Sequence, residues 1–361
     1  MKTGVRVVIG AWATSRAMLV LIAVIAVQTQ GKSLDEVLGN WDVQHFLAIA
    51  NNGYAVENDI AFFPGWPLLL KAISLTGLPV IITGAVLSAG LSLAAVAALY
   101  RMGGWGAAVA WILAPVGVFT LAPYTESLFC AAAFWAWERA GAKRWGQAAA
   151  LAAVAASVRV SGLFLFGALV ILALTQTLAI DDRLERWIAR WKHVAWMLIP
   201  LGVILAYACF LYLERGSWSA WFDAQSAGWN REFTWPWDCL QHTFAAAAPG
   251  AYPDFPEWPW MFRGELVSFA VGLIVTAICL ARKKLAEASW IGVQLLAFAT
   301  SYWLLSVNRA VLLWFPLWTE VGRLANVRST PARLGVMAAG ALSLGAQWIW
   351  AWLFFVGSWA S

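Results

Sequence analysis

The uncharged run LPVIITGAVLSAGLSLAAVAALY occupies residues 78–100 and decides the class of this protein. A helix of about 17–25 predominantly apolar residues is long enough to cross the hydrocarbon core of a bilayer. Comparable runs recur along the chain, continuous in Ala, Leu, Val and Trp rather than alternating as in a membrane β-barrel. We predict membrane spans near residues 8–29, 78–100, 104–122, 125–141, 145–158, 163–180, 193–213, 265–281, 287–306, 310–326 and 334–357.

The composition supports the same class, because 62% of the 361 residues are hydrophobic and 12% are charged. Soluble domains carry about 25% charged residues, so this chain has too little polar surface to cover itself in water. Residues 1–30 are predicted to be the first span rather than a signal peptide, since the apolar run is long and no small-residue cleavage site follows it. The cysteines, Cys130, Cys209, Cys239 and Cys279, show neither metal-ligand spacing nor a disulfide framework.

Charge asymmetry orients the predicted spans, because cytoplasmic loops carry an excess of Lys and Arg. With the N-terminus in the cytoplasm, 16 of the 24 basic residues fall on that side, whereas Arg16 and Lys71 lie at membrane depth or at its edge. The cytoplasmic set is Lys2, Arg6, Arg101, Arg139, Lys143, Arg144, Arg183, Arg186, Arg190, Lys192, Arg282, Lys283, Lys284, Arg323, Arg328 and Arg333. Because the basic residues are spread over short loops, topology explains the pI of about 9.1 better than nucleic-acid binding does.

Two long segments, 30–61 and 214–264, then lie outside the cytoplasm. The stretch Phe62–Thr76 is short and rich in Pro and Gly, so we predict a partial helix at the outer interface. The sequence contains no internal repeat or low-complexity tail. We therefore predict that residues 1–361 form a single all-α polytopic membrane domain with about 10–12 transmembrane helices.

The first outer segment carries local helix signals. Ser33 and Glu36 have the spacing of a capping box, Asn40 is a candidate N-cap, and Gly53 fits a helix C-terminus. Asp42 and His45 are three residues apart, so both lie on one surface of the predicted helix. Its apolar face, typical of a helix lying on a membrane, holds Trp41, Phe46, Ile49 and Ala50.

The residues of this segment follow the pattern Trp41-Asp42-x-x-His45-Phe46-x-x-Ile49-Ala50-x-x-Gly53-Tyr54, then Glu57, then Ala61-Phe62-Phe63-Pro64-x-Trp66-Pro67. This pattern resembles the signature of the GPI mannosyltransferase 2 family, the phosphatidylinositol-glycan class V (PIG-V) type with its bacterial relatives. Trp66 stands where the family more often has Tyr. Shorter matches follow at Pro123-Tyr124-Thr125-Glu126-Ser127, Arg159-x-x-Gly162, Asn308-Arg309 and Phe315-Pro316-Leu317.

The resemblance implies a GT-C glycosyltransferase fold, an inverting transfer and a polyprenyl-phosphate mannose donor, with a glycolipid or glycan as acceptor. In the predicted topology, polar residues at the outer ends of several spans converge on one level of the membrane, as a site requires. By resemblance and chemistry together, Asp42 is the candidate catalytic base, and Arg309 and Arg159 are candidates for the leaving phosphate. The remaining candidate substrate-binding residues are Trp41, His45, Tyr54, Glu57, Tyr124, Glu126 and Asn308.

Structural roles compete with these assignments. Asp42 caps or solvates a surface helix in the plain interpretation, His45 packs with one hydrogen bond, and Glu126 pairs with Arg159 for structural reasons. Arg16 either snorkels or reaches a phosphate. The 26 tryptophans are more often interfacial belts than sugar platforms. In the second outer segment, the candidate acceptor contacts are Asp223, Glu232 and Asp238.

No cofactor is predicted, because the three histidines are not paired at ligand spacing and the outer segments contain no DxD run. A divalent cation held by Asp42 and Glu57 stays open. A transporter or flippase of a lipid-linked sugar or solute is the alternative function, although the sequence lacks the paired halves typical of transporters. The Ala- and Trp-rich composition without an Asn-x-Ser/Thr sequon indicates a bacterial plasma membrane protein, with its site on the extracytoplasmic side.

Overall fold

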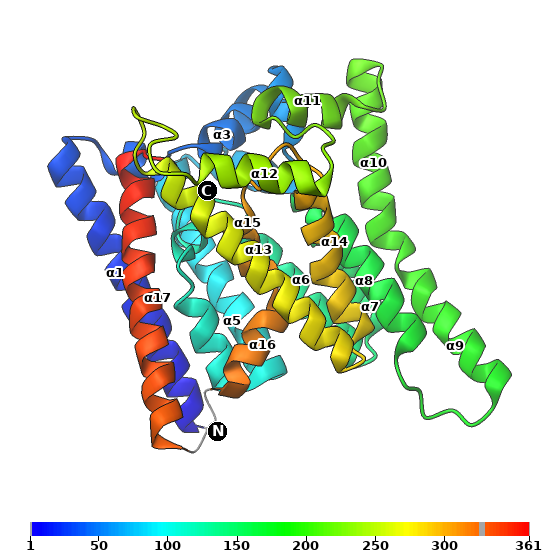
Figure 1. The fold of residues 1–361 in the computed structure, drawn as a ribbon. Helices are drawn as coiled ribbons and strands as arrows, with labels where there is room; N and C mark the ends of the chain where they lie inside the picture. Colours follow the sequence, from blue (N-terminus) through cyan, green and yellow to red (C-terminus); the bar gives the residue numbers. More distant parts are fainter. Residues whose placement is uncertain (1, 325–328, 361) are drawn as a thin grey trace.

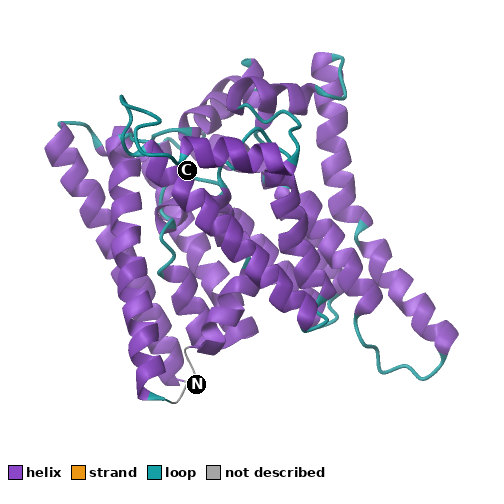
Figure 2. Cartoon of the chain, viewed as in Figure 1, coloured by secondary structure: helices purple, strands orange, loops and turns teal. Residues whose placement is uncertain are grey.

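The computed structural model describes residues 2–324 and 329–360, within which every regular element is a helix (Figure 2). Among these residues, five stretches are long and apolar enough to cross a membrane: Thr3–Gln30, Val80–Ile112, Arg183–Arg215, Trp258–Ala281 and Arg333–Val356. Three shorter apolar helices accompany them, Trp145–Val158, Ser161–Thr175 and Leu285–Ala299. The predicted all-α, multi-pass membrane architecture is confirmed.

The helices form a tilted bundle with small helices at one end (Figure 1). The bundle comprises α1 (Lys2–Gln30), α5 (Val80–Ile112), α6 (Glu126–Gly141), α7 (Trp145–Val158), α8 (Ser161–Thr175), α9 (Arg183–Trp196), α10 (Leu198–Arg215), α13 (Trp258–Ala281), α14 (Leu285–Ala299), α16 (Phe315–Leu324) and α17 (Thr330–Val356). The predicted outer segments supply α2 (Leu34–Leu38), α3 (Asp42–Asn52), the 3-10 turn η1 (Glu57–Ala61), α11 (Ala220–Trp229) and α12 (Pro236–Ala246). Helix α4 (Gly65–Ser74) is ten residues long, in keeping with the predicted partial helix.

Helix α5 is two antiparallel pieces joined at Gly104. This glycine adopts φ 77° and ψ −172°, which interrupts the helix and which residues with a side chain rarely adopt. Before the break, Tyr100 lies beside Gly4 near the start of α1. After it, Ile112 is back at the level of Ser15, whose hydroxyl donates to the Ile112 carbonyl (3.5 Å). The predicted reversal between two segments in this region is therefore present.

The predicted span 104–122 is wrong beyond Ile112, where the helix ends and residues 113–125 run as irregular chain with one 3-10 turn, η2 (Gly117–Thr120). Irregular backbone at membrane depth is tolerated only where protein groups satisfy its polar atoms. Gln347 of α17 does so here, since its side-chain amide donates to the carbonyls of Ile112 (3.0 Å) and Ala114 (2.8 Å). Apolar composition alone does not reveal this helix end.

Arg16 of α1 secures the same irregular segment. Its guanidinium donates to the carbonyl oxygen (2.9 Å) and the hydroxyl (2.6 Å) of Thr120, and the residue is only 7% exposed. From the other side, the indole of Trp66 in α4 donates to the carbonyl of Pro123 (2.8 Å). Arg16 therefore holds the backbone that leads into α6.

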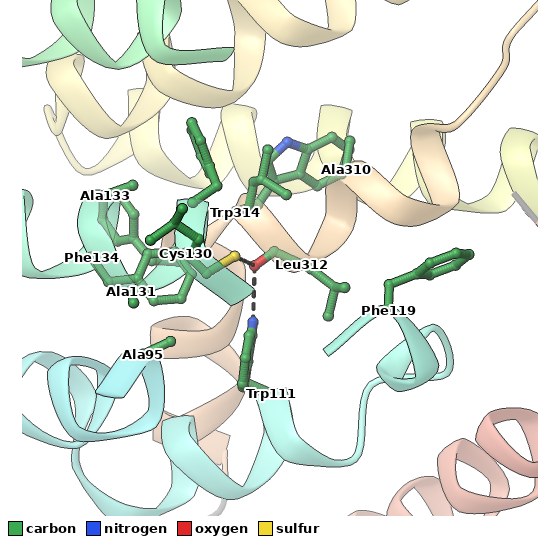
Figure 3. Packing of buried hydrophobic residues seen from close by; sticks show 14 of the residues in the cluster. Ala95, Trp111, Phe119, Cys130, Ala131, Ala133, Phe134, Ala310, Leu312 and Trp314 are labelled. Carbon is green, nitrogen blue, oxygen red and sulfur yellow. Dashed lines mark hydrogen bonds between the residues drawn. The ribbon is translucent and has the colours of Figure 1, made fainter. Parts of the chain in front are cut away.

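A second irregular segment precedes α16 and is also buried. It comprises α15 (Val307–Ala310) and the 3-10 turn η3 (Val311–Leu313). Figure 3 shows the indole of Trp111 and the thiol of Cys130 converging on the carbonyl of Leu312, at 2.9 and 3.6 Å. The indole of Trp290 donates to the next carbonyl, that of Leu313 (3.1 Å). Both irregular segments are thus fixed by side chains from helices that pack around them.

The helix caps and helix ends predicted in the first outer segment are partly confirmed. Ser33 and Glu36 form the predicted capping box at the start of α2, and Gly53 ends α3 with φ 68°. The prediction that Asn40 caps α3 is wrong, because the helix begins one residue later behind Trp41. The amide of Asn40 instead donates to the carbonyl of Phe354 in α17 (2.9 Å).

Candidate active site

A cavity of about 410 Å³ opens among the small helices at the end of the bundle. About half of the residues that line it are aromatic, and a few polar and charged side chains line it as well. Its lining includes Trp41, Asp42, Phe46, Phe62, Phe119, Tyr124, Thr125, Arg159, Trp221, Trp229, Arg231, Trp258, Trp303, Ser306, Arg309 and Trp359. These residues come from α3 and the residue before it, the η1–α4 connection, the segment before α6, the α7–α8 turn, α11 and the connection after it, the start of α13, residues 303–309 and the chain after α17. The cavity therefore depends on distant parts of the chain.

Four charged side chains form one network at this cavity. Arg309 donates to Asp42 Oδ2 (2.8 Å) and, through Nε and the second terminal nitrogen, to Glu126 Oε1 (3.0 and 2.9 Å). Arg159 donates to the same Glu126 oxygen (2.6 Å) and to the hydroxyl of Thr125 (2.8 Å). Two carboxylates are therefore matched by two guanidiniums.

The side chains of this network differ in how far they are exposed to solvent. The Glu126 side chain is fully buried, that of Arg309 is 9% exposed, and that of Asp42 is 17% exposed. The inner carboxylate is thus a fixed anchor for both arginines, whereas the outer one reaches the cavity. This order suits a buried support that holds an accessible reactive group.

Tyr124 and Phe119 set the position of Arg309 and of the start of α3. The Arg309 guanidinium lies 4.9 Å from the ring centre of Phe119 and 5.0 Å from that of Tyr124, in cation–π contact. The hydroxyl of Tyr124 accepts from the Asp42 backbone N–H (3.1 Å) and donates to the Asn40 carbonyl (3.4 Å). One tyrosine therefore ties the helix that carries Asp42 to the arginine that pairs with it.

Two strained backbone positions flank the network. Trp41, directly before Asp42, has φ 60° and ψ −125°, and Ser306, three residues before Arg309, has φ 67°. Such conformations cost about 1–3 kcal/mol in residues other than glycine and concentrate at functional sites. The indole of Trp41 donates to the carbonyl of Ser358 (3.2 Å), which holds its ring at the edge of the cavity.

Glu265 of α13 positions the segment that carries Arg309. One of its oxygens accepts from the backbone N–H of Ser306 and the other from that of Asn308, each at 2.9 Å. The carboxylate thereby satisfies N–H groups at the start of α15, which would otherwise lack partners. The sequence analysis did not identify this residue, since a single acid near the end of a predicted span gives no pattern.

Some predicted site residues are not brought into the cavity. His45 is absent from the cavity lining; its ring lies 2.7 Å from the carboxylate of Asp59 and is stacked on Phe62. The hydrogen bond of the His45 side chain is thus to Asp59 and not to Asp42. Asp59 is 2% exposed, and its second oxygen has no partner among the described residues. Sequence reasoning missed Asp59, although it lies inside the motif, between Glu57 and Ala61.

Tyr54, Glu57 and Asn308 are likewise absent from the cavity lining as described. The hydroxyl of Tyr54 donates to the carbonyl of Phe62 (2.8 Å), and Glu57 is exposed at the start of η1. The amide of Asn308 donates to the carbonyl of Met261 in α13 (3.3 Å). The predicted acceptor contacts Asp223, Glu232 and Asp238 also lie outside the described lining.

The residues brought together are Trp41, Asp42, Tyr124, Glu126, Arg159 and Arg309. The structure adds Arg231, from the connection between α11 and α12, which lines the cavity and was not predicted. Within the described ranges, no group of three or more His, Cys, Asp or Glu side chains is arranged to hold a metal ion. The site therefore offers one accessible carboxylate, several guanidiniums and many aromatic side chains.

Comparison with known proteins bears on this arrangement. The profile of the family described as mannosyltransferase (PIG-V) matches residues 13–235, more than half of the chain. The chain belongs to this family. GPI alpha-1,6-mannosyltransferase 2 of Rattus norvegicus is 35% identical over 149 residues, and that of Homo sapiens is 34% identical over the same length. GPI mannosyltransferase 2 of Drosophila pseudoobscura pseudoobscura is 27% identical over 116 residues.

These alignments are partial. The rat and human alignments each cover 36% of this chain and 30% of the relative, and the Drosophila alignment covers 27% and 26%. No solved structure matches the chain. The family profile includes Asp42, Glu126, Arg159 and Arg231, whereas Arg309 lies beyond its end. The PIG-V match therefore covers most of the cavity, and the structure supplies the arginine that completes the network.

Proposed function

We propose that this PIG-V family member is an inverting glycosyltransferase that moves mannose from a polyprenyl-phosphate mannose to a hydroxyl of a glycolipid or glycan. We place this reaction on the extracytoplasmic face of the membrane, most simply a bacterial plasma membrane. The observation that carries the proposal is Asp42, a carboxylate that reaches an aromatic cavity while Arg309 fixes its orientation. Membership of a mannosyltransferase family supports the choice of sugar.

The proposed reaction needs one base. The acceptor hydroxyl oxygen attacks the anomeric carbon of mannose from the side opposite the phosphate, a new glycosidic bond forms, and the bond from carbon to phosphate oxygen breaks. Asp42 takes the hydroxyl proton, and a base positioned in this way typically contributes about 10²–10⁴-fold to the rate. The lipid phosphate leaves with the electron pair and needs no acid, since it is stable as an anion.

The walls of the cavity suit such substrates. Trp221, Trp229, Trp258 and Trp303 offer flat apolar faces against which a sugar ring or an isoprenoid unit can pack. The network of two carboxylates and two arginines lies at this one cavity. A transporter or flippase would require two alternating openings around a site near the bilayer midplane, so that alternative is not favoured.

The test is transfer of labelled mannose from polyprenyl-phosphate mannose to a lipid extract of the source membrane, comparing wild type with Asp42→Asn. We expect Asp42→Asn to fold and to lose about 10²–10⁴-fold in rate, because the amide keeps the shape and cannot accept the proton. Asp35→Asn is the matched control, since Asp35 is exposed on α2 in the same outer segment. Equal turnover by wild type and Asp42→Asn would refute the assigned base.

A further inference from the structure

One of the arginines that line the cavity has no carboxylate partner among the described residues, whereas the other two are paired. Arg309 is neutralised by Asp42 and Glu126, and Arg159 is held by the same Glu126. The two arginines predicted to meet a phosphate are thus already committed to carboxylates. A leaving phosphate gains negative charge as its bond to the sugar breaks, so its binding site needs positive charge that is not already balanced.

Arg231 supplies that charge. It lines the cavity, and its guanidinium donates only to a backbone carbonyl, that of Leu305 (3.3 Å), with no carboxylate within ion-pair distance among the described residues. Burial lowers the pKa of Arg231 to about 10, and repulsion from Arg309 and Arg159 acts in the same direction. The side chain remains cationic at neutral pH.

The chain around Arg231 is fixed before any ligand binds. Asn230 ends α11 in the left-handed conformation with φ 51°, which turns the backbone back toward the cavity. The Arg231 N–H then donates to the carbonyl of Gln225 (3.2 Å), and the Thr234 N–H donates to that of Thr300 (3.1 Å). The guanidinium is therefore carried on a braced connection rather than on a loose loop, which limits the entropy lost on binding an anion.

We propose that Arg231 binds the phosphate of the lipid donor and of the lipid phosphate released after transfer. This inference rests on the proposed function and assigns the leaving-group end of the cavity to the α11–α12 connection. A guanidinium without a carboxylate partner in a partly buried site is unfavourable by itself, and a phosphate relieves that charge with charge-assisted hydrogen bonds. The phosphate group, not the sugar, is the feature that Arg231 recognises.

The experiment measures binding of polyprenyl phosphate and of the neutral polyprenol to detergent-purified protein, beside mannose transfer. Arg231→Gln should weaken binding of polyprenyl phosphate by about 10–100-fold, the value of one hydrogen bond between charged groups, and should leave polyprenol binding unchanged. Arg231→Lys should recover part of the loss. The control is Arg215→Gln, since Arg215 also donates to a carbonyl, that of Tyr54, but is exposed and outside the described cavity lining.

Thermal unfolding separates a binding role from a structural one. Because Arg231 is an unbalanced cation, Arg231→Gln should unfold at the wild-type temperature or above it without ligand. Polyprenyl phosphate should then raise the unfolding temperature of wild type and not that of Arg231→Gln. If wild type transfers mannose while Arg231→Gln binds polyprenyl phosphate equally well, the assignment to Arg231 is wrong and the proposed function stands. If wild type neither binds polyprenyl phosphate nor transfers mannose, both fail.

Discussion

Gly162 is the position where a single methyl group should disturb the site from a distance. It follows the turn between α7 and α8 that carries Arg159, and its N–H donates to the Arg159 carbonyl (2.9 Å). A Cβ at Gly162 would lie 2.3 Å from the Cα and 2.8 Å from the N of Ala156. Both are backbone atoms of α7, so the clash cannot be relieved by turning a side chain.

The size of the effect follows from this distance. Ordinary contacts of a Cβ begin at 3.4 Å, so Gly162→Ala must open the turn by about 1 Å. Overpacking of this kind typically costs 1–3 kcal/mol, so we expect a lower unfolding temperature. Arg159 donates to Glu126 at 2.6 Å, and a displacement of about 1 Å in positioned groups can cost about 10²-fold in rate.

The assay is thermal unfolding followed by tryptophan fluorescence, together with the mannose-transfer rate below the unfolding temperature. Gly167→Ala is the control in the same helix, because a Cβ there meets nothing within 4 Å. Alanine is also the better helix former, so Gly167→Ala should leave stability unchanged or raise it. Wild-type stability and activity in Gly162→Ala would show that the close approach of α7 and α8 is absent and would refute this reasoning.

Three other changes test separate parts of the structure. His45→Ala should lower the free energy of unfolding by about 1–3 kcal/mol, because it removes the partner of the buried Asp59 carboxylate, and adding Asp59→Asn should recover part of this in thermal unfolding. Glu126→Gln should lower both stability and transfer rate, because two arginines lose their shared carboxylate. The N–H and hydroxyl of Ser33 hold the pKa of Glu36 below its ordinary value, so the capping box should persist at neutral pH and be lost as the pH falls through that lowered pKa. Proteolysis of the segment before α3 should therefore increase in acid, and Ser33→Ala should show the increase already at neutral pH.

Much of the fold follows from the sequence, because run length and composition report burial in a bilayer directly. The capping box at Ser33 and the helix end at Gly53 were also predictable, since each depends on atoms within four residues. The cap at Asn40 was not, because its amide is taken by the Phe354 carbonyl, 314 residues away in the chain. The same holds for the helix end at Ile112, whose carbonyl is satisfied by Gln347.

The site residues likewise separate into those that local sequence patterns indicated and those that only the structure reveals. A dense local pattern pointed to Asp42, and short separate matches pointed to Glu126, Arg159 and Arg309. The structure joins these residues through hydrogen bonds that no spacing in the sequence encodes. Glu265 and Arg231 were missed because each is an isolated charged residue whose importance comes only from its surroundings, the start of α15 in one case and the cavity in the other.

Features that cost folding free energy, namely buried ion pairs and strained backbone, are concentrated at the site, and they identify it independently of any motif. Buried ion pairs seldom stabilise a protein over well-packed apolar residues, yet Glu126 is fully buried with two arginines. The strained residues Trp41 and Ser306 flank the same network. The first buried irregular segment ends at Glu126, and the second contains Arg309. In a chain selected only for stability, such buried charges and strained residues would be absent or scattered over the molecule. Their concentration around one cavity, lined by an accessible carboxylate and by a guanidinium without a carboxylate partner among the described residues, is the pattern expected of a site that separates charge during a reaction.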